Sequence, residues 1–129
     1  MEPKHVLVVD DEPSVLDVVG TRLKTAGYRV TTARTGNEAL RAVRDDRPDL
    51  AVVDLLMPGL DGYGFCAMVK RDLTLRFPIV VISGRTDERD RQRALDAGAA
   101  TFVAKPFNDR RLLDAIEKLL AEQTQPQEP

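Results

Sequence analysis

Cysteine and histidine each occur only once in this sequence, as Cys66 and His5. A single cysteine excludes an internal disulfide framework and any metal site built from several cysteines. We expect Cys66 on a buried helix face, as a small apolar side chain. His5 precedes the first apolar run, and the chain has no serine–histidine arrangement of the kind used in nucleophilic catalysis. Neither residue indicates a functional site.

Long apolar runs and a strong net charge are also absent. No run approaches the length of a membrane-spanning helix, and no apolar targeting region precedes the first strand, so we expect a soluble cytoplasmic domain. The formal net charge of −2 gives no reason to expect nucleic-acid binding. Nucleotide binding has no support either, because both common glycine-rich phosphate-binding motifs are missing. The 129 residues, 43% of them hydrophobic, predict one globular domain.

Apolar runs that predict strands alternate with segments of helical spacing. The strands are expected at 5–9, 28–33, 50–54, 77–82 and 101–104. The helices are expected at 13–26, 35–47, 63–73, 86–97 and 108–121, and the third should bury Phe65, Met68 and Val69. Residues 122–129 are rich in glutamine and proline, which predicts a disordered tail or the start of a linker after a domain of residues 1–121.

This alternation predicts an α/β fold, a flavodoxin-like doubly wound (βα)5 three-layer sandwich. Short connections and right-handed crossovers favour the strand order 2-1-3-4-5, with the switch point between the first and third strands. The second strand alternates apolar and polar residues, which indicates an edge of the sheet.

One stretch, residues 48–62, is the most informative. Four apolar residues, 50–53, are followed by Asp54 and then by the breaker Met57-Pro58-Gly59. This pattern predicts a strand buried on both faces that ends in a carboxylate. Open α/β sheets bind their ligands at the carboxyl ends of the strands, so we expect Asp54 in a functional site.

Polar residues follow the other strands too: Asp10 and Asp11, Ser83, and Lys105. Two carboxylates 4 Å apart repel each other by about 4 kcal/mol at an effective dielectric near 20, and Lys105 alone provides too little positive charge. Oxygen ligands suit a hard divalent cation such as Mg²⁺, which often binds phosphate oxygens as well. Asp54, which faces Ser83 and Lys105, is the candidate nucleophile of an aspartyl-phosphate reaction.

Four motifs in this order resemble the response-regulator receiver domain of bacterial two-component signalling, as in chemotaxis regulators. The resemblance covers residues 5–121. The motifs are Val8-Val9-Asp10-Asp11-Glu12, Asp54-Leu55-Leu56-Met57-Pro58-Gly59-Leu60-Asp61-Gly62, Ile82-Ser83-Gly84 and Lys105-Pro106-Phe107.

The resemblance implies a role for each of these residues. Asp54 would accept a phosphoryl group, and Mg²⁺ would bind Asp10, Asp11, Asp54 and the Leu56 backbone carbonyl. Ser83 would provide the switch hydroxyl, Lys105 would contact the phosphoryl oxygens, and Phe102 would be the aromatic switch.

Three finer expectations follow from the resemblance. The Lys105–Pro106 peptide bond should be cis, a minority state of such bonds. Leu56 and Arg85 occupy positions that tune the lifetime of the phosphoryl group in this family. Because an apolar Leu56 cannot hydrogen-bond an attacking water, we expect slow hydrolysis.

The resemblance also implies the partners. The phosphoryl donor would be a sensor histidine kinase or a phosphotransfer protein. The face of the fourth helix, fifth strand and fifth helix would control an output protein, a linked effector domain or a phosphorylation-dependent homodimer. Such a domain is not a turnover enzyme, since it catalyses only its own phosphorylation and dephosphorylation. The sequence identifies neither the kinase nor the output.

Other interpretations of these residues remain open at this stage. Asp10 and Asp11 could cap a helix, Ser83 could belong to a turn, and Lys105 could be solvated. The chain could be a degenerate receiver that docks proteins without phosphorylation. An aspartyl-phosphate phosphatase or phosphotransferase is disfavoured, because haloacid-dehalogenase-like enzymes use Asp-x-Asp after the first strand and a cap domain.

Overall fold

A single parallel sheet organises the chain. The computed structural model describes residues 2–84, 87–105 and 109–124. The strands pair in the order β2-β1-β3-β4-β5, as predicted. They are β1 (His5–Val9), β2 (Arg29–Ala33), β3 (Leu50–Asp54), β4 (Ile79–Ser83) and β5 (Thr101–Ala104).

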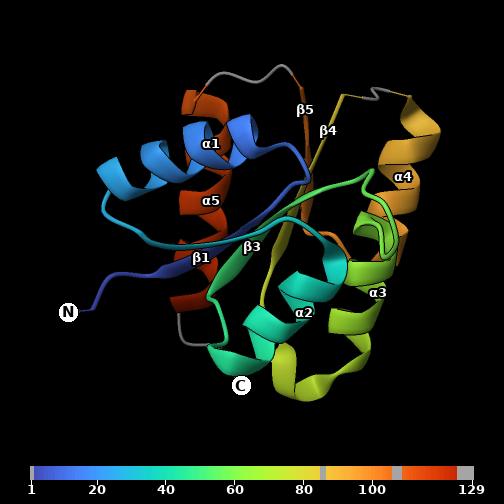
Figure 1. Cartoon of the computed structure of the whole chain (residues 1–129), viewed down its shortest axis with the longest axis horizontal. Coiled ribbons are helices and arrows are strands. Elements are labelled where there is room, and N and C mark those ends of the chain that lie inside the picture. The colour runs from blue at the N-terminus through green and yellow to red at the C-terminus, as the bar shows by residue number, and fades with distance from the viewer. Residues whose placement is uncertain (1, 85–86, 106–108, 125–129) are drawn as a thin grey trace.

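Helices cover both faces of this sheet (Figure 1). Helices α1 and α5 lie on one face, and α2, α3 and α4 lie on the other, which completes the predicted three layers. None of the helices in the described part of the chain has the length and apolar character needed to cross a bilayer. The helices are α1 (Pro13–Thr25), α2 (Gly36–Asp45), α3 (Gly62–Arg71), α4 (Glu88–Ala97) and α5 (Asp109–Thr124), and a 3₁₀ turn η1 (Leu73–Leu75) follows α3.

Each inner strand contributes to two apolar cores. In β1, Val6 and Val8 pack with the residues of α1 and α5, whereas Leu7 and Val9 pack with those of α2 and α3. Side chains alternate between the faces of a strand, so a strand covered on both faces must be apolar throughout. This double burial explains the unbroken apolar runs of β1, β3 and β4.

Side-chain caps and glycines set the ends of the helices. The Thr35 hydroxyl accepts a hydrogen bond from the Glu38 N–H at the start of α2, and Asp87 accepts one from the Arg89 N–H at the start of α4. Gly98 ends α4 in the left-handed conformation, with φ of 119°. Such caps satisfy backbone groups that a helix leaves unpaired at its ends.

His5 is the first residue of β1, within the strand expected at 5–9. It is only 3% exposed, its ring Nε2 lies 2.7 Å from the Thr31 hydroxyl oxygen, and its backbone N–H donates to Asp49 at 2.7 Å. The residue therefore ties β1 to edge strand β2, at the end of the sheet opposite the carboxyl ends.

Several predicted details differ in the structure. Met68 is 41% exposed and does not join the buried side of α3. Strand β4 begins at Ile79 and α3 ends at Arg71. Helix α5 continues to Thr124, so the residues directly after 121 are helical and not part of a disordered tail. The rest of that tail, 125–129, lies outside the described residues.

The close contact between α3 and the end of β3 is open to a stability test. A Cβ at Gly62 would lie 2.7 Å from the Asp54 carbonyl oxygen and 2.8 Å from the Leu55 Cα. These are backbone atoms that cannot move aside cheaply, so we expect Gly62→Ala to lower the free energy of unfolding by about 1 to 3 kcal/mol in urea denaturation.

Gly20→Ala in α1 is the matched control. Its Cβ would meet Val30 at an ordinary 3.9 Å, and alanine in place of a helical glycine stabilises by about 0.5 to 1 kcal/mol. Equal changes in the free energy of unfolding of the two variants would contradict the proposed crowding at Gly62.

Candidate functional site

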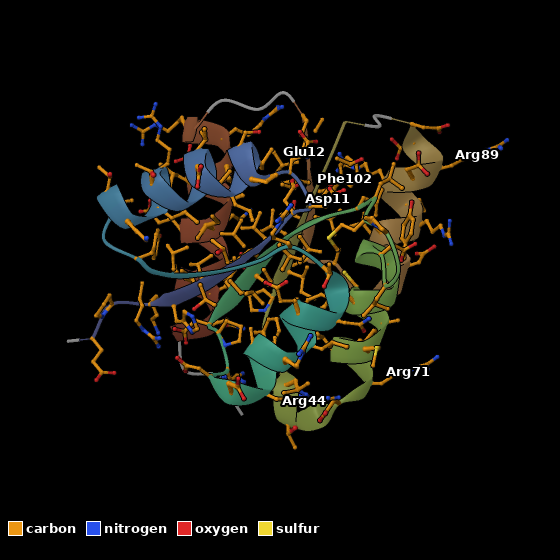
Figure 2. All side chains as sticks on the ribbon, in the orientation of Figure 1. Asp11, Glu12, Arg44, Arg71, Arg89 and Phe102 are labelled. Carbon is orange, nitrogen blue, oxygen red and sulfur yellow. The ribbon has the colours of Figure 1, made fainter. Side chains whose placement is uncertain are left out.

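The carboxyl ends of the strands bring the predicted polar residues to one edge of the sheet. Asp54 ends β3, Ser83 ends β4, and Asp10 and Lys105 directly follow β1 and β5. Val9 pairs with Val53 in the sheet, so the residues that follow them, Asp10 and Asp54, are also neighbours. Figure 2 labels Asp11 and Phe102 near this edge, where β1 leads into α1.

Asp10, Asp11 and Asp54 form an acidic cluster. A carboxylate oxygen of each lies within 4.8 Å of one from each of the others. Asp10 is fully buried and Asp54 is 6% exposed, whereas Asp11 is half-buried. Three carboxylates so close and so poorly solvated repel one another strongly, and their donor set consists of oxygens alone, which is the set that hard divalent cations prefer. The cluster therefore fits a metal ion.

Lys105 provides a positive charge beside this cluster. Its ammonium group donates to Asp10 Oδ2 at 3.0 Å and lies 3.6 Å from Asp54 Oδ1. The Lys105 backbone N–H donates to the Ser83 carbonyl, which fixes where the side chain leaves β5. Burial disfavours the charged ammonium, but the hydrogen bond to Asp10 and the charge of Asp54 outweigh burial and raise the pKa of Lys105.

Asp54 itself has a perturbed carboxyl group. Burial and the neighbouring charge of Asp10 raise its pKa to about 6, although Lys105 and a hydrogen bond from the Leu56 backbone N–H act in the opposite direction. The one ammonium of Lys105 also leaves the three carboxylates of the cluster with an excess of negative charge. The carboxylate is mostly ionised at neutral pH and lies in a site that can accept further positive charge.

The capping interpretation of Asp10 accounts for only part of its contacts. Its Oδ1 accepts a hydrogen bond from the Glu12 N–H at 3.0 Å, which shapes the turn into α1. The residue at the cap position of α1 is Glu12, whose side chain makes no capping hydrogen bond. Asp10 therefore orders the loop with one oxygen and binds Lys105 with the other.

Ser83 and Phe102 lie on the β4–β5 side of Asp54. Ser83 is 1% exposed at the end of β4, and its neighbour Ile82 pairs with Asp54. Phe102 is half-buried on β5 and lines a hollow of about 380 Å³ between α4 and α5. The lining of this hollow includes the charged side chains of Glu88, Arg91 and Arg111.

Three residues near the site were not singled out from the sequence as functional. The Asp61 side chain caps α3 by accepting the Gly64 N–H, and the Gly62 N–H donates to the Leu55 carbonyl, so α3 begins directly against the end of β3. Arg34 lines a hollow of about 420 Å³ together with Asp11. Its position just after β2, at the same edge of the sheet, was the available signal.

Some expectations remain predictions. Arg85 and the peptide bond to Pro106 lie outside the described residues. The Leu56 side chain is 48% exposed, and its role and that of its carbonyl are untested.

The raised pKa of Asp54 predicts a pH-dependent effect of Asp54→Asn on stability. The folded protein binds a proton more tightly than the unfolded chain, so the stability of the wild type falls as the pH rises from about 4 to about 6. With EDTA present, the free energy of unfolding of Asp54→Asn should exceed that of the wild type by about 1 to 3 kcal/mol at pH 8. Urea denaturation should show that advantage shrinking below pH 6. An advantage independent of pH would contradict this account.

Comparisons with known proteins agree with this geometry. The family model described as "Response regulator receiver domain" matches residues 6–117. The "Probable transcriptional regulator ycf27" of Guillardia theta is 40% identical over 117 residues, which are 91% of this chain and 45% of that protein. The "Alkaline phosphatase synthesis transcriptional regulatory protein PhoP" of Bacillus subtilis (strain 168) is 36% identical over 91% of this chain and 48% of its own.

The chain thus spans about half the length of the curated relatives it matches. Among solved structures, chemotaxis protein CheY4 of Vibrio cholerae has a TM-score of 0.86 and 33% identity, and the match covers 91% of this chain and 98% of that one. The family match covers most of the chain and includes the acidic cluster, Ser83 and Lys105. This chain therefore belongs to the family of response regulator receiver domains.

Proposed function

We propose that this domain is a phosphorylation-dependent signalling switch in which Asp54 accepts a phosphoryl group from a histidine kinase or a phosphotransfer protein. One observation carries the proposal. Asp54 is a buried carboxylate at the carboxyl end of β3, clustered with Asp10 and Asp11 and 3.6 Å from the Lys105 ammonium. Phosphoryl transfer depends mainly on such positioning and charge neutralisation.

The covalent step needs no oxidant or reductant. An Asp54 carboxylate oxygen forms a bond to phosphorus as the phosphorus–nitrogen bond of the donor phosphohistidine breaks. The leaving imidazole nitrogen keeps that electron pair and takes a proton, and the product is an acyl phosphate. Lys105 lies close enough to the attacking carboxylate to bind an incoming phosphoryl oxygen. With a pKa of about 6, Asp54 is still mostly ionised at neutral pH and can therefore act as a nucleophile.

We propose Mg²⁺ as the cation that fits the acidic cluster. Carboxylates of Asp10, Asp11 and Asp54, with the Leu56 backbone carbonyl, would hold it. Bound there, it would offset the negative charge of the carboxylates and of the phosphoryl group. Lys105, which binds Asp10 at 3.0 Å, provides the remaining positive charge.

The signal would leave through Ser83 and Phe102. The Ser83 hydroxyl, at the end of the strand that pairs with β3, would approach a phosphoryl group on Asp54. Phe102 would then enter the space vacated near Ser83, and because it lacks a hydroxyl it acts through burial alone. This two-state rearrangement changes the face formed by α4, β5 and α5.

The partner at that face would be an output protein, a linked effector domain or a second copy of the chain. Two relatives described as transcriptional regulators, each about twice as long as this chain, support an output in transcription through a linked effector. In this account the domain catalyses only its own phosphorylation and hydrolysis. The acidic cluster and the Lys105 ammonium 3.6 Å from Asp54 support phosphorylation over the docking-only alternative.

Intact mass spectrometry tests the proposal directly. Incubation with Mg²⁺ and acetyl phosphate should add one phosphoryl group to the wild type. The adduct should be absent in Asp54→Asn and in the presence of EDTA. Glu38→Gln is the matched control, since Glu38 is an acidic residue beside the site but outside the cluster, and it should be phosphorylated normally. A persistent adduct on Asp54→Asn, or no adduct on the wild type, would overturn the proposal.

The lifetime of the adduct tests the role of Leu56. Its exposed apolar side chain cannot orient a water molecule, whereas an asparagine there can donate or accept a hydrogen bond. We expect Leu56→Asn to shorten the phosphoryl half-life by about threefold to tenfold, as one added hydrogen bond would. Val18→Asn, at another exposed apolar residue, should leave the half-life unchanged. An equal or longer half-life in Leu56→Asn would refute this role.

A further inference from the structure

Helix α4 has little apolar contact with the rest of the domain. Among its described residues only Ala94 is buried, and most of the other side chains are charged or polar. The helix lies beside α3 (Figure 1). Helices usually gain their stability from burying an apolar face, so the position of α4 depends more than usual on polar contacts with α3.

Tyr63, in the first turn of α3, makes two such contacts. Its hydroxyl donates a hydrogen bond to Asp90 at 3.2 Å, and the Arg93 guanidinium carbon lies 4.0 Å from the centre of its ring. Asp90 and Arg93 are three residues apart on α4 and therefore share one face of that helix. One largely buried tyrosine thus binds an anion with its hydroxyl and a cation with its ring face.

The backbone that carries Tyr63 is held against the phosphoacceptor strand. The preceding residue, Gly62, donates its N–H to the Leu55 carbonyl at 3.0 Å and leaves no room for a Cβ beside the Asp54 carbonyl. Helix α4, for its part, follows β4, which ends at Ser83. Tyr63 therefore connects the end of the Asp54 strand to the helix that follows the Ser83 strand.

We propose that Tyr63 is a positioning residue of the switch. Its contacts with Asp90 and Arg93 hold α4 in the unphosphorylated arrangement, and phosphorylation of Asp54 releases them. The inference rests on the proposed function. A contact made only in the unphosphorylated state opposes phosphorylation, so by linkage its removal favours the phosphorylated state.

Tyrosine fluorescence reports these contacts directly. The chain has two tyrosines and no tryptophan, so in a Tyr28→Phe background Tyr63 is the only tyrosine. A hydrogen-bonded carboxylate quenches tyrosine emission. We therefore expect emission to rise when Mg²⁺ and acetyl phosphate are added, and to be high from the start in Tyr28→Phe/Asp90→Asn.

Intact mass recorded on the same samples separates two kinds of failure. Unchanged emission despite a phosphoryl adduct would overturn the role of Tyr63 and leave the proposed function standing. No adduct at all would overturn the proposed function and, with it, this inference. The Asp54→Asn variant in the same background should show neither adduct nor rise in emission.

Phosphorylation rates give a readout that a purely structural role would not move. Tyr63→Phe keeps the ring over which Arg93 lies and removes only the hydroxyl, so it should be phosphorylated by acetyl phosphate about fivefold faster, the effect of losing one hydrogen bond. The phosphorylation rate of Asp90→Asn should rise by a similar factor. The double variant should be no faster than either single variant, because both remove the same contact.

Tyr28→Phe is the matched control and should be phosphorylated at the wild-type rate. A Tyr63→Phe rate equal to or below that of the wild type would refute the role of Tyr63. If the rate increases of the two single variants combine in full in the double variant, Tyr63 and Asp90 act separately. That result would also refute the proposed role of Tyr63.

Discussion

The attraction between the Lys105 ammonium and the buried carboxylates of Asp10 and Asp54 is the interaction on which this site depends. The carboxylates come from strands β1 and β3, and the ammonium follows β5, so the attraction spans the carboxyl edge of the sheet. The compensation is incomplete, because one ammonium faces the three carboxylates of the cluster. An uncompensated negative charge of this kind is costly for the fold, but it equips the site to bind a cation.

The sheet makes such an arrangement tolerable. Strands β1, β3 and β4 are buried on both faces by two apolar cores, and the energy of that burial supports a strained polar cluster at their ends. The crowding extends into the first turn of α3, where Gly62 contacts the backbone of Asp54 and Leu55. Asp54, the proposed phosphoacceptor, is thus held by backbone contacts and by charge.

The two helices of the proposed output face, α4 and α5, are built differently. Helix α5 buries Leu112, Ile116 and Leu120 in the core, whereas α4 buries only Ala94 among its described residues. A helix held mostly by polar contacts changes position at lower cost than one anchored by apolar packing. This contrast supports the proposal that α4, held by the Tyr63 contacts with Asp90 and Arg93, is the element that moves.

The sequence by itself determined which segments form strands and which polar residues stand at their ends, and it favoured the observed strand order. Buried parallel strands are continuously apolar, and a carboxylate directly after such a run, as at Asp54, is unmistakable. Contacts between residues distant in the chain were decided only in three dimensions. The pairing of Tyr63 with Asp90, the burial of His5 against Thr31 and the exposure of Met68 depend on how α3, α4 and β2 pack. Local periodicity specifies which face of an element is apolar, whereas packing geometry decides which side chain on that face finds a partner.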